Sequence, residues 1–427
     1  MDTHLLRDIQ SGALDKPLAA LYTSGGLAEA RARAARTVRA FQTAFSAGQE
    51  VPAALFSGPG RTEIGGNHTD HQHGRVLCGS VDLDMLACAA PNGTRFIRIL
   101  SEGYPALEVD LDDLAVRPAE ANSSAALVRG IAARVRELGY PLSGFDACVT
   151  STVLPGSGLS SSAAYETLVG NILDRFCCGG ALDPVTIAKI GQYAENVYFG
   201  KPCGLMDQMG SSVGGAVFID FTDPASPAVE QVNYDFSRSG HALCIVDTGS
   251  SHGDLTGDYA DITVEMKSVA AYFGREVLRQ VPEADFRAAL PALRKRCGDR
   301  AVLRAIHFYG DDRRAAQEAE ALKAGDFPRF LALVNESGLS SELHLQNAWS
   351  VSDPRQQAVP LALTAARELL EGTGAVRVHG GGFAGTIQAF VPNGRLEPFK
   401  AGMEALLGPG KCHILRIRPW GGCVVAD

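Results

Sequence analysis

The chain has 427 residues, of which 46% are hydrophobic and 20% charged, and its formal net charge is −9 at pH 7. That length exceeds one ordinary hydrophobic core, so we expect two packed domains, and the apolar content excludes a mainly disordered chain. Acidic and basic residues are interspersed without a block of Lys or Arg, which excludes nucleic acid and anionic membrane as main partners and favours a small-molecule ligand.

The N-terminal stretch "MDTHLLRDIQSGALDKPLAA" lacks the basic and apolar regions of a signal peptide, and no later segment offers eighteen consecutive apolar residues. We therefore expect a soluble, cytoplasmic protein. As a separate expectation, we take it to be a monomer. The ten cysteines are scattered, mostly within apolar runs, and they form no CxxC pair. We interpret them as reduced core residues rather than as disulfides or zinc ligands.

The first half of the chain mixes helices and strands. Ala, Arg and Leu content and spaced apolar positions predict a helix over residues 25–46. Strands are predicted at "VPAALFSG", and at "RVLCGSVDLDMLACAA" and "TRFIRILSEG", which the turn signal "PNG" joins. A helix over "SAALVRGIAARVRELG", with Gly139 as its C-cap, precedes a strand at "GFDACVTSTVL". Helical patterns then cover "LSSSAAYETLVGNILDRF" and "PVTIAKIGQYAENVYFG".

The second half begins with strands at "GGAVFIDF" and "HALCIVDTG", followed by a mainly helical region from about 257 to 347 and a helix at "PLALTAARELLEG". A strand pair around a glycine turn is predicted at "AVRVHGGGFAGTIQAFVP", then a helix at "RLEPFKAGMEALL" and a strand at "HILRIRP". This mixture predicts an α+β fold. The boundary signal "DPASPA" near residue 225 divides the chain into an N-terminal domain, 1–225, and a C-terminal domain, 226–427.

Glycine and serine occupy the strand-to-helix junction in "VLPGSGLSSSAAYETLVG", residues 153–170. Free N–H groups and the positive dipole end of a helix start favour bound phosphate there, although the spacing and lysine of a Walker A loop are absent. The serines could cap the helix, bond phosphate or ligate magnesium, and three are more than a cap requires. The candidate phosphate-binding residues are Gly156, Ser157, Gly158, Leu159, Ser160 and Ser161.

Two other segments carry chemistry. The segment "GGGFAG", residues 380–385, has the letters of a dinucleotide fingerprint but precedes a strand rather than a helix, so close backbone approach to a ligand or to the first glycine loop fits better. Asp207, in "CGLMDQMGSSVGGA", is either a surface carboxylate or functional. Together with Glu195 it offers two carboxylates for metal and base roles.

The stretch "GGNHTDHQHG", residues 65–74, puts three histidines and an aspartate within six positions. The residue types alone allow a metal site, an acid/base cluster or a ligand pocket.

Four segments together resemble the galactokinase branch of the GHMP kinases: "GPGRTEIGGNHTDHQHG", "VLPGSGLSSSAAYE", "AENVYFGKPCGLMDQ" and "VHGGGFAGTIQAFV". They occur in the order and at the separations of that family, and the resemblance covers about residues 30–427. It implies ATP-dependent phosphorylation of the anomeric hydroxyl of galactose. It also implies a two-domain GHMP kinase fold, with a ribosomal protein S5 domain 2-like N-terminal domain, a ferredoxin-like C-terminal domain and the active site between them.

The resemblance also implies roles for residues of this chain. Arg61 and Asp207 match the catalytic pair beside the reacting hydroxyl, and Ser162 and Glu195 match ligands of the Mg²⁺ that accompanies ATP. The matching sugar-contacting positions are Asn67, His68, Asp70, Gly204 and Tyr259. The histidine cluster is then interpreted as a sugar pocket rather than as a zinc site.

The match has departures. The family usually reads "GEHTDY" where this chain has "GNHTDH", so Asn67 replaces a glutamate that contacts a sugar hydroxyl near C6, and His71 replaces a tyrosine. Glu63 replaces the family's usual asparagine. Near residue 124, "NSSAALVRG" lacks the tryptophan that often lies close to adenine. A neutral amide can donate to a substrate carboxylate that a glutamate would repel, so a sugar 1-kinase acting on galacturonate or another C6-modified sugar is an alternative.

Two further alternatives remain open at this point. A GHMP kinase acting on a small alcohol such as mevalonate or homoserine is opposed by the polar run "HTDH" beside Arg61. A catalytically silent regulator that binds sugar and ATP is opposed by the presence of both Arg61 and Asp207.

Overall fold

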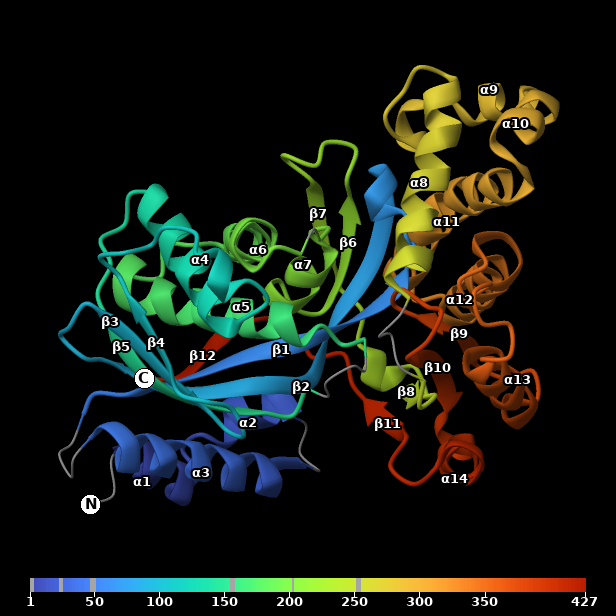
Figure 1. Ribbon diagram of the computed structural model, residues 1–427. Helices are drawn as coiled ribbons and strands as arrows, with labels where there is room; N and C mark the ends of the chain where they lie inside the picture. The colour runs from blue at the N-terminus through green and yellow to red at the C-terminus, as the bar shows by residue number, and fades with distance from the viewer. Residues whose placement is uncertain (1–3, 23–25, 47–50, 154–157, 202, 251–254) are drawn as a thin grey trace.

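The computed structural model describes residues 4–22, 26–46, 51–153, 158–201, 203–250 and 255–427. Two lobes are visible in Figure 1, one built around a large twisted sheet and the other around a smaller sheet with helices outside it. In the described residues, no helix is both long and apolar enough to cross a membrane. The α+β fold predicted from the sequence is confirmed.

The larger sheet has eight strands within the described residues, in the order β12-β1-β2-β5-β3-β4, with β6 pairing to β2 and β7 to β6. It is mixed, because β3 pairs with β5 in parallel whereas β1 and β2 are antiparallel. Its strands are β1 (Ala54–Gly65), β2 (Arg75–Pro91), β3 (Phe96–Ser101), β4 (Leu107–Asp110), β5 (Phe145–Ser151), β6 (Ala216–Asp220), β7 (Ala228–Val232) and β12 (Cys423–Ala426).

The sheet differs from the sequence expectation in its pairing. Strands β2 and β3 exist, but they are not neighbours, because β5 lies between them and hydrogen-bonds to both. Strands β7 and β12 were not predicted. They lie after residue 225 yet join the larger sheet, so segments on both sides of the predicted boundary build it. The boundary itself stays a prediction.

Helices cover both faces of this sheet (Figure 1). One layer packs its apolar side chains against Leu55, Leu86 and Cys88. It consists of α1 (His4–Ser11), α2 (Asp15–Tyr22) and α3 (Leu27–Phe45), of which only α3 was clearly predicted. The opposite layer consists of α4 (Ser124–Glu137), α5 (Ser161–Leu173), α6 (Pro184–Tyr193) and α7 (Met206–Ser212), with the π-helical turns η4 (Asp174–Cys178) and η5 (Ala194–Phe199).

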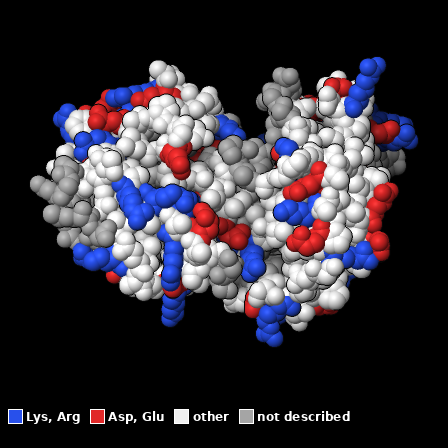
Figure 2. Space-filling view, turned by 90° about the horizontal axis from the view of Figure 1, so that it is seen from below, with Lys and Arg blue, Asp and Glu red and all other residues white. Residues whose placement is uncertain are grey.

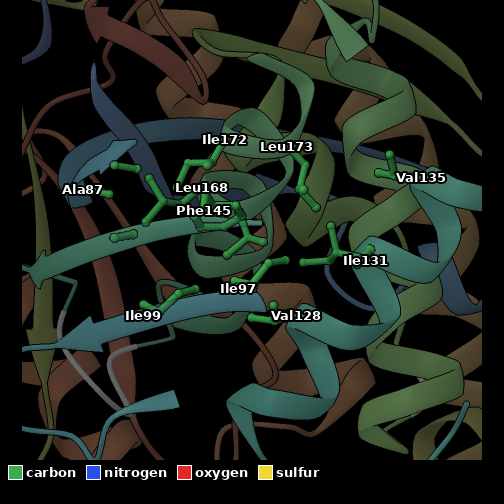
Figure 3. Close-up of a cluster of buried hydrophobic side chains, with 14 of the residues drawn as sticks. Ala87, Ile97, Ile99, Val128, Ile131, Val135, Phe145, Leu168, Ile172 and Leu173 are labelled. Carbon is green, nitrogen blue, oxygen red and sulfur yellow. The ribbon is translucent and has the colours of Figure 1, made fainter. Parts of the chain in front are cut away.

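The core between this second layer and the sheet is shown in Figure 3. Leu168 and Ile172 lie one turn apart on α5, and Ile131 faces them from α4, so a helical period aligns them over the strands. All three are fully buried. Truncating such a side chain to alanine costs roughly 2–5 kcal/mol of stability. This packing holds the C-terminal half of α5 against the sheet.

The smaller sheet has four strands among the described residues, in the order β11-β8-β10-β9, all antiparallel. The predicted strand pair around the glycine turn is confirmed as β9 and β10, and the mainly helical region 257–347 is confirmed. The strands are β8 (His241–Asp247), β9 (Ala375–His379), β10 (Thr386–Pro392) and β11 (Cys412–Leu415). The helices are α8 (Thr256–Tyr272), α9 (Glu283–Ala288), α10 (Leu290–Cys297), α11 (Asp299–Lys323), α12 (Phe327–Ser340), α13 (Ala358–Leu370) and α14 (Leu396–Leu407).

The distribution of charge on the surface agrees with the interspersed acidic and basic residues of the sequence. On the face seen in Figure 2, acidic and basic side chains are interspersed over both lobes. All ten cysteines are free thiols, and six of them are buried. Their interpretation as reduced core residues stays a prediction.

Candidate active site

Arg61 lies near the end of β1, where the strand meets the second helical layer. The register of β1 against β2 shifts between Pro59 and Arg61, and such irregularities redirect side chains. Gly210 of α7 allows the close approach of that helix, because a Cβ at this position would lie 3.0 Å from Arg61 Cβ. The guanidinium is thereby buried and directed toward the first turn of α7.

Asp207, in the first turn of α7, receives this guanidinium. Arg61 Nε donates to Asp207 Oδ1 at 2.7 Å, and Arg61 also donates to the Gly158 carbonyl. Ser160 Oγ donates to the other carboxylate oxygen, Asp207 Oδ2. Both predicted catalytic residues therefore meet at the start of α5, and Ser160 bonds the aspartate instead of capping the helix.

Electrostatics keep this carboxylate ionised. Burial acts to raise the pKa of Asp207, but the charge of Arg61, the hydrogen bonds from Ser160 and Arg61 and the charge of Lys201 outweigh it. The pKa of Asp207 consequently lies below its usual value. An ionised, half-buried carboxylate is a suitable acceptor for a hydroxyl proton.

The predicted phosphate loop leads into this site. Gly156 and Ser157 lie outside the described residues, whereas Gly158 has a left-handed φ of +71° and Ser161 is the first residue of α5. The Leu159 carbonyl accepts from the Arg61 backbone N–H at 3.0 Å, which ties the loop to β1.

The second glycine segment lies against this loop. A Cβ at Gly158 would be 3.1 Å from His379 Nδ1 and 3.2 Å from Thr386 Oγ1, the residues on either side of "GGGFAG".

Two side chains whose oxygen atoms could ligate a metal ion face each other beside the phosphate loop. Ser162 Oγ donates to Glu195 Oε1 at 3.2 Å, and the buried Glu195 is presented by η5. The ammonium of Lys201 also lies 3.4 Å from Glu195 Oε1. A hydroxyl and a carboxylate are the hard oxygen ligands that suit Mg²⁺, so this pair fits such an ion. Among the described residues, no group of three or more His, Cys, Asp or Glu side chains could hold a metal ion.

Asp70 and Gly204 are brought together from segments 134 positions apart in the sequence. A Cβ at Gly204 would lie 2.3 Å from Asp70 Oδ2, so only glycine leaves room for that carboxylate. Asp70 Oδ1 accepts from the His71 backbone N–H at 2.9 Å, which leaves Oδ2 directed at Gly204 and the turn before Asp207.

His68, from the larger lobe, and Tyr259 of α8 both contact the glycine segment between β9 and β10. His68 Nε2 lies 2.9 Å from the Gly381 carbonyl, and the Tyr259 hydroxyl donates to the Gly382 carbonyl at 2.9 Å. A carbonyl only accepts, so Nε2 carries the proton and Nδ1 is the acceptor nitrogen of the neutral ring. Burial and the neighbouring His71 lower the pKa of His68 to about 4, so the ring is neutral near pH 7.

Asn67 is fully buried and its amide is surrounded by protein. Its Nδ2 donates to Glu63 Oε1 at 2.8 Å and to the Gly380 carbonyl at 2.7 Å. Its Oδ1 accepts from Asn347 at 2.8 Å and from Ser341 at 3.3 Å. These contacts use all four hydrogen-bonding positions of an amide. The sugar contact at Asn67 therefore stays a prediction that these contacts do not support.

Some residues near the site were not predicted from the sequence. Lys201 lies within the motif "AENVYFGKPCGLMDQ", and a cation beside two carboxylates was a signal that could have singled it out. Gln208 and Glu166 lie behind Glu195, and nothing in the local sequence distinguishes them from core residues. Burial and the charge of Glu195 raise the pKa of Glu166 well above its usual value.

Comparison with known proteins first defines the class. Residues 126–215 match the model of the GHMP kinases N terminal domain. The fold is similar to the crystal structure of Lactococcus lactis galactokinase complexed with galactose, with a TM-score of 0.76 and 22% identity over 92% of this chain and 99% of that chain. It is also similar to a mevalonate kinase, with a TM-score of 0.60 and 15% identity over 85% and 98% of the two chains. The protein has the GHMP kinase fold.

The sequence relatives narrow the class. Residues 39–91 match the galactokinase galactose-binding signature. Galactokinase of Streptomyces coelicolor is 32% identical over 78% of this chain and 84% of that protein, and galactokinase of Streptomyces lividans is 31% identical over 81% and 83%. The chain belongs to the galactokinase family. It is an ATP-dependent sugar kinase. These relatives favour neither a catalytically silent regulator nor a kinase acting on a C6-modified sugar.

Proposed function

We propose that the protein transfers the γ-phosphoryl group of ATP to the anomeric hydroxyl of galactose, giving galactose 1-phosphate and ADP. The observation that carries this proposal is the contact of Asp207 with both Arg61 and Ser160, at the point where the sugar-matching residues and the start of α5 converge. The hydroxyl oxygen attacks the γ-phosphorus, the bond from phosphorus to the β,γ-bridging oxygen breaks, and ADP leaves with that electron pair.

Asp207 would orient the hydroxyl and accept its proton. Because its pKa is held below the usual value, it is a weak base. Proton transfer is therefore expected late, when the forming O–P bond has made the hydroxyl more acidic. Arg61 would keep the carboxylate in place and offset the negative charge of the transferring group.

Phosphate binding would use the start of α5, where backbone N–H groups and the helix dipole favour an anion. Ser162 and Glu195 would hold a Mg²⁺ ion, which supplies charge neutralisation of the phosphates when it is bound. The ammonium of Lys201 lies 3.4 Å from Glu195 Oε1, and its charge also lowers the pKa of Asp207. Its ammonium is suited to a phosphate oxygen.

The sugar would be held by hydroxyl contacts of different kinds. Asp70 is a carboxylate acceptor, and His68 presents a neutral Nδ1 acceptor because its Nε2–H is engaged by Gly381. Tyr259 is fixed by Gly382, so its ring and hydroxyl form one wall of the site. The contact of His68 with Gly381 joins the two lobes, so residues of both would line the sugar site.

The decisive experiment is an ADP-release assay with ATP and Mg²⁺ on galactose, galacturonate, glucose and N-acetylgalactosamine, with the product position assigned by NMR. We expect galactose to be preferred and phosphorylated at C1. Absence of turnover on galactose alongside turnover of another sugar would overturn the substrate, and phosphorylation at another hydroxyl would overturn the reaction.

A further inference from the structure

Gln208 follows Asp207 in α7 and is fully buried. Its single nitrogen Nε2 lies 2.8 Å from Glu195 Oε2 and 3.0 Å from Glu166 Oε2. An amide nitrogen carries two hydrogens, so one donor group is shared between two carboxyl groups. Asp207, the proposed catalytic residue, directly precedes Gln208. The first turn of α7 therefore carries both that aspartate and an amide that contacts Glu195, the candidate metal ligand.

This arrangement distinguishes the two oxygens of Glu195. Oε2 faces the interior and accepts from Gln208, whereas Oε1 faces the start of α5, where Ser162 Oγ lies at 3.2 Å and Lys201 Nζ at 3.4 Å. A carboxylate held by one oxygen has its other oxygen fixed in direction. Partners of this kind behind a metal ligand typically contribute 10–100-fold to metal affinity.

The surroundings show that the contact is built into the packing. A Cβ at Gly191 of α6 would lie 2.9 Å from Glu166 Oε2 and 3.3 Å from Gln208 Cγ, so glycine leaves space for both side chains. Among the described residues, Glu166 Oε1 and Gln208 Oε1 are buried without a hydrogen-bond partner. Burying such atoms is costly, and an isolated structural role for Gln208 would not require the two carboxyl groups beside it.

We propose that Gln208 is a positioning residue that holds Glu195 Oε2 so that Oε1 points at the divalent cation accompanying the nucleotide. The inference rests on the proposed function, because it takes Glu195 as a ligand of that cation.

The test is direct measurement of Mn²⁺ binding by EPR, with a non-hydrolysable ATP analogue present. Gln208→Met preserves length and burial but removes both N–H donors. We expect its Mn²⁺ affinity to fall about 10–100-fold. Galactose phosphorylation should require a correspondingly higher Mg²⁺ concentration, with kcat at saturating Mg²⁺ close to that of the wild type. Gln208→Asn retains the amide but shortens the side chain by one methylene, so the amide is withdrawn from Glu195. This variant should also have a lower affinity for Mn²⁺ than the wild type.

The matched control is Ser212→Ala. Ser212 is a buried polar residue of the same helix, and its hydroxyl donates to the Pro184 carbonyl rather than toward Glu195. Its Mn²⁺ affinity should match the wild type, even if its thermal stability falls as much as that of the Gln208 variants.

The outcomes separate the two proposals. If Glu195→Gln loses Mn²⁺ binding while Gln208→Met and Gln208→Asn bind within twofold of the wild type, the positioning role is overturned and the proposed function stands. If Glu195→Gln itself binds Mn²⁺ normally, Glu195 is not a ligand and both the metal assignment and the positioning role fail.

Discussion

The side-chain amide of Asn67 donates a hydrogen bond to the carboxylate of Glu63 at 2.8 Å. Two of the positions at which the chain departs from the galactokinase pattern are therefore in direct contact. Arg377 of β9 pairs with the same carboxylate at 2.7 Å, so the pair also joins the two lobes. An asparagine and a glutamate have exchanged places, and the number of buried charges has not changed.

The reciprocal exchange should reveal this coupling. Asn67→Glu alone places a second carboxylate beside Glu63, and leaving a buried charge without a partner costs about 3 kcal/mol or more. The double variant Glu63→Asn/Asn67→Glu returns to one carboxylate and should recover most of that loss. Urea unfolding at pH 8 measures the stability of both variants. This pH is chosen because burial raises the pKa of Glu63 to about 7, so its carboxyl group is ionised at pH 8. Equal instability of the single and double variants would show that the contact is incidental.

Replacing Asp207, the proposed catalytic residue, should strongly reduce turnover without removing the nucleotide. Asp207→Asn keeps the shape but cannot accept the proton, so kcat should fall about 10²–10⁴-fold. The affinity for an ATP analogue should stay within about fivefold of the wild type, since one hydrogen bond is worth about 1 kcal/mol.

The control for Asp207→Asn is Asp146→Asn. Asp146 is also a buried aspartate that pairs with an arginine, Arg98, at 2.7 Å, but it lies in β5 away from the site. The Asp146→Asn variant should be less stable than the wild type but should retain the wild-type kcat. A fully active Asp207→Asn enzyme would remove the proposed role.

Adding a methyl group at Gly204 should disturb the sugar rather than the nucleotide. A Cβ there would lie 2.3 Å from Asp70 Oδ2, so Gly204→Ala must displace that carboxylate. Loss of one charged hydrogen bond predicts a rise in KM for galactose of about tenfold, with KM for ATP little changed. Gly394→Ala is the control, because its added Cβ meets nothing within 4 Å. An unchanged KM for galactose would place Asp70 outside the sugar site.

Lys201 should act on the phosphate side. Its side chain is 62% exposed, so its charge is partly screened, and Lys201→Met should raise KM for ATP by only about fivefold, or roughly 1 kcal/mol. The effect should shrink in high salt. Lys189→Met, on α6, removes a lysine whose ammonium donates to the Ala225 carbonyl, and it should leave both KM values unchanged. If the two variants behave alike, Lys201 contributes nothing specific.

Stability in acid should depend on Asp311. Burial acts to raise its pKa, but His307, Arg314 and Arg377 outweigh burial and lower it from 3.8 to about 2. A depressed pKa gives stability that is present above 3.8 and is lost as the pH falls toward 2, on the order of 2 kcal/mol here. Unfolding curves of the wild type and Asp311→Asn should therefore differ at pH 5 and converge as the pH falls from 3.8 to 2.

Asp82 supplies the opposite case as a control. Burial raises its pKa to about 6, so its contribution is present below 3.8 and is lost as the pH rises through 6. The stability of Asp82→Asn relative to that of the wild type should accordingly increase as the pH rises. A pH-independent difference for Asp311→Asn would mean that its carboxylate does not stabilise the fold in its ionised form.

Much of this molecule was predictable from local patterns. Apolar spacing predicted the helix at 25–46 and the strands around the "GGGFAG" turn, because each element buries one face and the period of that face is written in the sequence. The motifs likewise predicted Arg61, Asp207, Ser162 and Glu195, since short stretches of defined chemistry recur wherever the same reaction is catalysed.

Strand pairing and hydrogen-bond partners were not predictable in this way. The insertion of β5 between β2 and β3 depends on which strands meet in space, and a turn signal such as "PNG" reports only that the chain reverses. Asn67 and Gly380 are 313 positions apart, so the residue type of Asn67 gave no sign that its amide would bond that carbonyl.

The sequence by itself determined the family and the order of most elements and predicted the reacting groups, because these reside in residue identity and local spacing. Only the tertiary structure decided how Asn67 is engaged, which oxygen of Glu195 faces Ser162, and that Gln208 lies behind it. Those facts depend on the packing of distant segments, where burial removes water as a competing partner and makes each polar group's protein contacts decisive.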